Sequence, residues 1–230
     1  MEFYRNRLLA ALPREEYRRM SANLEPVLLS PGRVIEEPEQ RPDYVYFPAD
    51  SLVSFVGITR HGARMDVGLV GHEGMTGIAA LLGSVVHFAA VVQIPGLAFR
   101  LAAPALTAMC RQSERLHSLF LRYIGTVLVE IRQSGVCHRF HSVRQRLCRW
   151  LLAVHDRLTS PTLRLTQESL SRMLGIRRAG ISEAAVELRR RRLIGYTRGE
   201  ITIIDRGGLE RASCECYELV RAHRLENLFS

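Results

Sequence analysis

The 230-residue chain contains no lysine, so all 32 of its basic residues are arginine. This absence excludes phosphate-binding loops that require a Gly-Lys-Ser or Gly-Lys-Thr sequence. The hydrolase sequence Gly-x-Ser-x-Gly and the metalloprotease sequence His-Glu-x-x-His are missing as well. We therefore expect that the protein is not an enzyme and that it has no catalytic residue.

Cysteine is absent from the first 109 residues, and the five cysteines that follow are an odd number. The N-terminal segment is charged and too short in its apolar part to be a signal peptide. We expect a cytoplasmic protein whose thiols are reduced.

Formal charge is missing from residues 74–99, a run longer than the roughly 20 residues that cross a membrane as a helix. The run contains Pro95 and several glycines, and its paired valines favour strands. It is therefore interpreted as a buried segment of a folded core, and no membrane contact is expected.

The net charge of +9 is distributed unevenly along the chain. Residues 1–110 hold 10 Arg and 11 acidic residues, whereas residues 111–230 hold 22 Arg and 12 acidic residues. A basic half joined to a nearly neutral one indicates that the C-terminal half meets a polyanion.

The N-terminal half contains two sequence patterns, one after the other. Leucines at helical spacing in residues 1–25 predict short surface helices. From Pro26 to about Leu101, short apolar runs are separated by Gly and Pro turns, with strict alternation at Met65, Val67 and Leu69. This spacing is typical of a small all-β roll.

A helical period begins after Pro104 and lasts more than thirty residues. We expect one seam of apolar side chains that pairs with a second copy, which makes a homodimer. The seam consists of Leu116, Phe120, Tyr123, Val127 and Ile131. Ser142 and Gln145 then fit a capping box that starts a new helix near Val143.

The region from Leu165 to Ile204 predicts a winged helix-turn-helix. Thr166 can cap a first helix, Gly175 suits the positive φ of a tight turn, and Ile181 packs the second helix against the first. Residues 193–197 and 200–204 predict a β-hairpin that forms the wing. The second helix of such a unit enters the DNA major groove.

These features together resemble the Crp/Fnr superfamily of bacterial transcription regulators over about residues 26–204. The most specific parts are Arg146–Leu152, Leu165–Arg178 and Leu193–Ile201. The resemblance implies an α+β fold with a cyclic-nucleotide-binding-like β-roll of jelly-roll type. The expected divisions are N-terminal helices (1–25), a β-roll sensor domain (26–104), a dimerisation helix (105–138) and a winged helix-turn-helix domain with a C-terminal helix (139–230).

The resemblance also implies that the chain binds a two-fold-symmetric operator through a recognition helix at about 177–191. The family's base-reading arginine falls on Arg178, and two neighbouring family positions are occupied by Ala179 and Glu183, which puts the usual half-site in doubt. The expected base-reading residues are Arg177, Arg178, Ser182 and Glu183, and the expected phosphate contacts are Thr166, Gln167, Arg189 and Arg198. RNA polymerase is a further candidate partner, although no motif here identifies its contact surface.

The expected effector site differs from that of cyclic-nucleotide members. Gly71, His72, Glu73 and Gly74 resemble the step into the family's effector loop, and His87 lies near the position of the phosphate-binding pair. No arginine lies between Arg64 and Arg100. A buried phosphate would lack its main compensation, so cAMP is not expected as the effector, which stays unknown.

The later cysteines leave redox or metal sensing open. The N-terminal cysteines that hold an iron–sulfur cluster in some relatives are absent. Cys137, His138 and His141 could form a four-ligand site across a two-fold axis. Cys214 and Cys216 are expected on one helix over 209–225, with one thiol buried and the other exposed. We expect no cofactor and no metal. The alternative function is a small-ligand or redox-sensing module that acts mainly through protein contacts.

Overall fold

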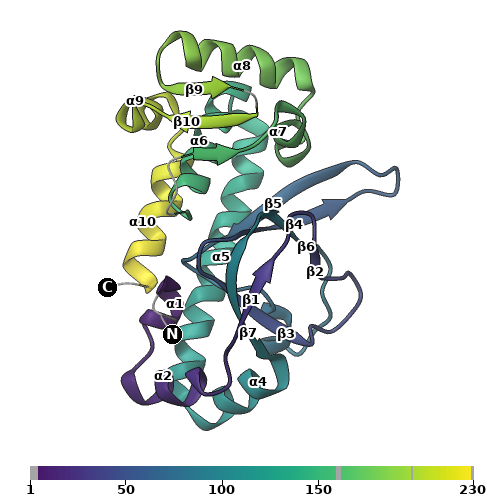
Figure 1. The fold of residues 1–230 in the computed structure, drawn as a ribbon, viewed down its shortest axis with the longest axis vertical. Helices are drawn as coiled ribbons and strands as arrows, with labels where there is room; N and C mark the ends of the chain where they lie inside the picture. Colours follow the sequence, from purple (N-terminus) through teal and green to yellow (C-terminus); the bar gives the residue numbers. More distant parts are fainter. Residues whose placement is uncertain (1–4, 159–161, 198, 229–230) are drawn as a thin grey trace.

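The computed structural model describes residues 5–158, 162–197 and 199–228. The fold is α+β, as expected, with a β-roll at one end and a winged helix-turn-helix at the other (Figure 1). The first part consists of α1 (Arg7–Ala10), α2 (Arg14–Ser21), β1 (Glu25–Leu29), β2 (Val34–Glu36), β3 (Tyr44–Pro48), β4 (Leu52–Ile58), β5 (Arg64–Val70), α3 (Ile78–Leu81), β6 (Ala89–Ile94), β7 (Gly96–Ala102) and α4 (Ala103–Gln112). The second part consists of α5 (Glu114–Phe140), α6 (Val143–His155), β8 (Thr162–Arg164), α7 (Gln167–Leu174), α8 (Arg178–Arg190), β9 (Ile194–Thr197), β10 (Glu200–Ile203), α9 (Arg206–Ala212) and α10 (Cys216–Leu228).

Two antiparallel sheets form the β-roll, in the orders β1-β7-β3 and β2-β6-β4-β5. The uncharged run becomes α3, β6 and the start of β7. Strands β6 and β7 are inner strands of their sheets, and Ala90, Val92, Ala98 and Phe99 are at most 1% exposed, which agrees with a buried core segment. Leu82 and Phe88, in the part of the run before β6, are exposed. Within the described residues, no helix combines the length and the apolar character needed to cross a membrane.

The long helical region is two helices and not one. Ser113 is extended, and its Oγ accepts a hydrogen bond from the Leu116 backbone N–H at 3.3 Å, so it caps a new helix. Helix α5 then runs for 27 residues, or about 40 Å. It passes along the β-roll and reaches the C-terminal domain (Figure 1).

The structure revises the expected dimer seam. Leu116, Phe120 and Tyr123 are at most 3% exposed because they pack into the core of the chain's own sensor domain. Val127 is half-buried beside the same core, and Ile131 is 38% exposed. The seam follows the helical period correctly, but most of it faces the β-roll and is covered by it.

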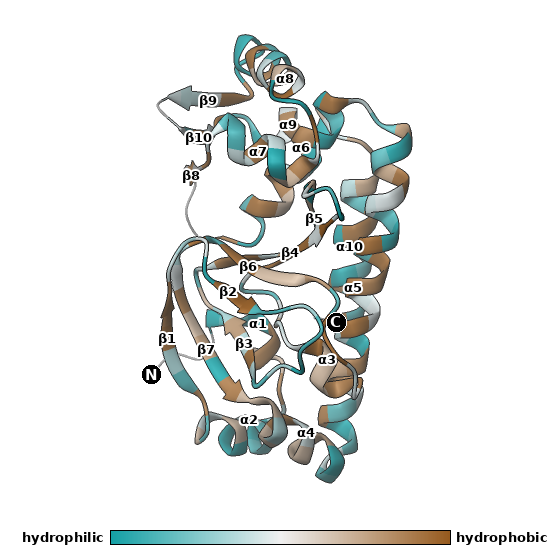
Figure 2. Cartoon of the chain, turned by 90° about the vertical axis from the view of Figure 1, so that its right-hand side faces the viewer, coloured by the Kyte–Doolittle hydropathy of each residue, from teal (hydrophilic) through white to brown (hydrophobic). Residues whose placement is uncertain are grey.

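The C-terminal helix also differs from the expectation. Residues 213–215 separate α9 from α10, so Cys214 lies in the link and Cys216 is the first residue of α10. Both thiols are buried, at 5% and 0% exposure. The expectation of one buried and one exposed thiol is therefore wrong, because it assumed a continuous helix. Helix α10 packs alongside α5 (Figures 1 and 2).

Candidate nucleic-acid interface

The helix-turn-helix forms from the local interactions that the sequence predicts. The Thr166 side chain accepts a hydrogen bond from the Ser169 N–H at 3.1 Å and caps α7. Helix α7 ends at Gly175, whose φ of 59° is in the left-handed region. The Ser171 hydroxyl donates to the Ile176 carbonyl at 2.5 Å and closes the turn.

The inner face of α8 anchors the helix firmly. Ile181 and Leu188 are fully buried, and Ala184 and Ala185 are nearly so. Glu187 forms an ion pair with Arg144 of α6 at 2.5 Å. The capping box that starts α6 at Ser142 is present as predicted. These contacts pack α8 against the rest of the domain by its inner face and leave its other face exposed.

The outer face of α8 lies at one end of the molecule (Figure 1). Arg177, Arg178 and Glu183 are exposed and Ser182 is partly exposed, so all four expected base-reading residues are on accessible parts of the helix. Arg178 and Ser182 lie on one side of the centre of that face, and Arg177 occupies the N-cap position without a side-chain capping hydrogen bond.

Three residues lie at the centre of this face. Ala179 was already placed at a family base-reading position by the sequence, whereas Val186 and Arg190 were not expected to face the bases. Opposite Ile181 and Leu188 lie Ala179, Val186 and Arg190, by the helical period. Val186 is 57% exposed, although it is a large apolar side chain. An apolar group here can contact a thymine methyl in the major groove. The sequence could have identified Val186 and Arg190, because they lie on the side of α8 opposite its buried apolar positions.

Of the expected phosphate contacts, Thr166 and Gln167 lie at the start of α7 and Arg189 lies near the end of α8. Thr166 and Arg189 are exposed. The Gln167 N–H donates to the Tyr196 hydroxyl at 3.1 Å, which places the start of α7 against the wing. Arg198 lies outside the described residues. The wing contains β9 and β10 as predicted, together with a third strand, β8, that the sequence did not predict.

The expected effector loop lies at the contact between the two domains. The Glu73 carboxylate accepts from the Gly71 N–H at 3.1 Å and from Arg157 Nε at 2.8 Å. The His72 ring Nδ1 lies 2.8 Å from the Arg157 carbonyl oxygen. A Cβ on Gly74 would come within 2.5 Å of the Tyr123 hydroxyl. Residues 71–74 thus fit closely between α5 and the end of α6.

Arg157 is the centre of this contact and is 1% exposed. Besides Glu73, it binds both carboxylate oxygens of Glu130 on α5, at 2.9 and 2.6 Å. Burial alone would raise the pKa of Glu73, but the charges of Arg157 and Arg224 lower it below its ordinary value. These four residues, Glu73, Glu130, Arg157 and Arg224, are called the hinge ion network below.

His87 lies elsewhere, exposed at a cavity of about 180 Å³ between the β-roll and α5. Residues 71–74 do not line this cavity, so the structure does not bring the expected effector residues together. The lining is mainly apolar and includes Val127 and Ile131 but no arginine. Its carboxylate, Glu36, has a pKa raised by burial. This chemistry does not suit a phosphate.

Comparison with known proteins relates this arrangement to one group of regulators. No curated protein matches the sequence. Among solved structures, FixK2 from Bradyrhizobium japonicum has a TM-score of 0.73 at 15% identity and covers 83% of this chain and 98% of its own. TTHB099, a transcriptional regulator of the CRP family from Thermus thermophilus, has a TM-score of 0.68 at 18% identity and covers 81% and 96%.

A third similar structure is CLP, the c-di-GMP-responsive global regulator of Xanthomonas campestris, with a TM-score of 0.62 at 14% identity and coverage of 83% and 99%. Residues 145–212 match the family described as the Crp-like helix-turn-helix domain. This range includes α7, α8 and the wing. The chain therefore has the fold of the Crp/Fnr transcription regulators and contains their Crp-like helix-turn-helix domain.

Proposed function

We propose that the chain is a homodimeric, sequence-specific DNA-binding regulator of transcription that reads a two-fold-symmetric operator through α8. The observation that carries the proposal is the anchored α8, whose exposed side includes Arg177 and Arg178 while its inner face is buried. Arginine can bind guanine O6 and N7 with two hydrogen bonds and so distinguish bases. Such a protein acts in the cytoplasm of a bacterium, and the proposal assigns no catalytic role to it.

The dimer contact falls on the face of α5 that the β-roll leaves uncovered. Leu121, Leu128 and Val136 are 47%, 46% and 45% exposed and follow one another at spacings of seven and eight residues. A stripe of this period suits a helix paired with its own copy along a coiled-coil seam. This revised seam supports the homodimer in place of the buried residues expected from the sequence.

The direct test is DNA binding by Arg178→Ala. Genomic fragments bound by the full-length protein would first be selected, and the operator then located by footprinting. The substitution is expected to weaken operator binding by about 10- to 100-fold while binding to unrelated DNA changes little. Operator affinity measured over a range of salt concentrations separates the two modes.

Two further variants make the test specific. Arg189→Ala is expected to weaken operator and unrelated DNA alike and to reduce the salt slope by about one, because a phosphate contact carries no sequence information. Arg14→Ala, at an exposed site on α2 at the opposite end of the molecule, serves as the matched control (Figure 1). Equal losses on both DNAs for Arg178→Ala would remove its base-reading role.

If the dimer binds no genomic fragment at low salt, the alternative of a sensing module that acts through protein contacts takes precedence. In that case, the cavity beside α5 becomes the main candidate for the ligand-binding site. Its apolar lining supports an uncharged, largely apolar effector over a cyclic nucleotide. Mapping the sites bound across the genome would show where the operators lie relative to promoters. Those positions would indicate whether the protein activates or represses and whether it contacts RNA polymerase.

A further inference from the structure

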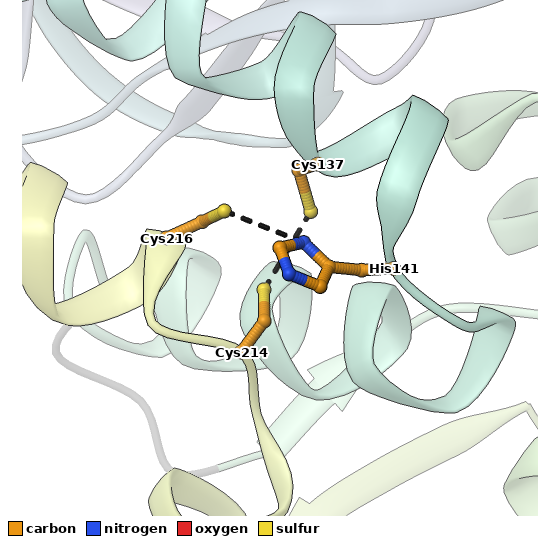
Figure 3. A group of neighbouring side chains, drawn as sticks. All are labelled: Cys137, His141, Cys214 and Cys216. Carbon is orange, nitrogen blue, oxygen red and sulfur yellow. Dashed lines mark hydrogen bonds between the residues drawn. The ribbon is translucent and has the colours of Figure 1, made fainter.

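Four side chains with metal-binding atoms meet where α5 ends. Cys137 lies in the last turn of α5, His141 follows that helix, and Cys214 and Cys216 come from the link and first residue of α10. Figure 3 shows the three thiols and the imidazole pointing toward one another. Their ligand atoms all lie within 4.8 Å of one another. His138, which the sequence also offered as a candidate, is not part of this group.

The spacing within the group fits a single tetrahedral ion. Zinc binds sulfur at about 2.3 Å and nitrogen at about 2.0–2.1 Å, so tetrahedral ligands are separated by about 3.8 Å (S to S) and about 3.6 Å (S to N). The Cys137 and Cys214 sulfurs are 3.6 Å apart, and Cys216 Sγ is 3.5 Å from His141 Nδ1. A polynuclear iron–sulfur cluster needs wider separation, because its own atoms lie between the ligands.

A second layer of contacts orients the ligands. His141 Nε2 lies 3.1 Å from the Glu215 carboxylate, which leaves Nδ1 directed at the cysteines. A carboxylate on the outer nitrogen is the usual partner of a metal-binding histidine. Gln133 Nε2 donates to Cys216 Sγ at 3.0 Å. These partners hold both side chains in the orientation that an ion requires.

Burial and charge also suit thiolates bound to a cation. Cys137 and Cys216 are fully buried, and Cys214 is 5% exposed. Three thiolates, one neutral imidazole and Zn²⁺ leave one net negative charge. Arg149 lies nearby, is 9% exposed, and has a buried Nε with no hydrogen-bond partner among the described residues. Its positive charge would offset that of the loaded site.

We propose that Cys137, His141, Cys214 and Cys216 bind one Zn²⁺ per chain as a closed structural site. Binding releases the proton of each thiol that becomes a ligand, with no change of oxidation state. Soft sulfur ligands select zinc over calcium or magnesium. The ion would join the end of α5 to α10, and thereby tie the helix from the sensor domain to the DNA-binding domain. This inference does not depend on the proposed DNA-binding function.

The test is metal analysis of the full-length protein purified without a histidine tag from zinc-supplemented cells. About one zinc per chain is expected. After zinc removal, added Co²⁺ should produce the visible bands of tetrahedral cobalt and thiolate-to-cobalt charge transfer in the near ultraviolet. Metal-free protein that gives no such spectrum would overturn the proposal, as would a Cys137–Cys214 disulfide in protein isolated without oxygen.

Substitutions of the proposed ligands test whether the ion binds at this cluster. Cys137→Ser and Cys216→Ser should each abolish stoichiometric zinc, while Cys110→Ala, at a buried thiol in the sensor core, should retain it. Glu215→Gln keeps all four ligands and should weaken zinc affinity by about 10- to 100-fold. Because the Glu215 side chain is 75% exposed, the conservative change is expected to leave the fold intact, so it keeps the test valid if the cysteine variants fail to fold. Full zinc retention in both serine variants would refute the assignment.

Discussion

The arginines of the recognition helix and those of the hinge have opposite environments, although both belong to the basic half of the chain. Arg177 and Arg178 are exposed at the end of the molecule. Arg157 is buried and bound to Glu73 and Glu130, and Arg149 is buried beside the cysteine cluster. The comparison shows that the arginines of the basic half lie in two environments. The exposed ones are available to the DNA of the proposed function, whereas buried Arg157 links the two domains through Glu73 and Glu130.

The largest effect is expected from Arg157→Met, which tests whether the buried arginine stabilises the fold. The substitution leaves the buried carboxylate of Glu73 and the partly buried carboxylate of Glu130 without their shared partner Arg157, and it should lower the free energy of unfolding by about 3–5 kcal/mol. For a chain of this size, the denaturation midpoint should fall by roughly 10 °C. Arg60→Met, at an exposed arginine of the β4–β5 turn, is the control and should change the stability by less than about 0.5 kcal/mol. A similar small effect at both positions would show that the hinge ion network does not stabilise the fold.

A steric change at the same contact should have a smaller effect. In Gly71→Ala, the new Cβ would lie 2.6 Å from Arg157 Cβ and 2.7 Å from the Arg157 carbonyl oxygen. Relief of this overlap must move the sensor loop away from α6, at a cost of about 1–3 kcal/mol measured by chemical denaturation. In Gly207→Ala in α9, the new Cβ would meet the flexible end of Arg211 at 3.4 Å and Asp205 Oδ1 at an ordinary contact distance of 3.7 Å, so stability should be unchanged or higher. Equal tolerance of both substitutions would contradict the close packing.

The smallest expected effect is a change in stability with pH, caused by Asp66 of β5. Asp66 lies at a second contact between the domains, in a cavity that is also lined by Ser169 and Arg172 of α7. Two further charged residues, Arg64 and Glu37, line the same cavity. Burial raises the pKa of Asp66 to about 7, against a weaker lowering by a hydrogen bond with Ser54. Because the folded pKa exceeds the unfolded one, the folded state holds an extra proton between about pH 4 and pH 7. Stability from this group is present at the acidic end and is lost as the pH rises through about 7.

Asp66→Asn keeps the uncharged state and should therefore stabilise the protein at about pH 8 but not at about pH 4. The side chain is partly exposed, so the gain is about 1 kcal/mol, or roughly 3 °C in the denaturation midpoint. Thermal denaturation across this pH range measures the difference. Glu15→Gln, at an exposed acid on α2, should show no such pH dependence. A parallel pH profile for Asp66→Asn and the unmodified protein would rule out this contribution.

Local features of the chain were predictable from its residues. The capping box at Ser142, the left-handed turn at Gly175 and the buried Ile181 all depend on neighbours within a few positions. The face of α5 was predicted less well. Its period correctly identified Leu116 and Phe120 as a buried stripe, but periodicity does not reveal whether the chain's own β-roll or a second copy covers that stripe.

The amino-acid sequence alone is enough to specify the helix-turn-helix, the wing hairpin and the uneven charge, since capping, turn geometry and side-chain period act between residues that are close in the chain. Folding in three dimensions decided the rest. Cys137 meets Cys214 across 77 positions, and Glu73 meets Arg157 across 84. No local pattern encodes such pairs, because they form only when packed helices and strands bring distant side chains to the same place.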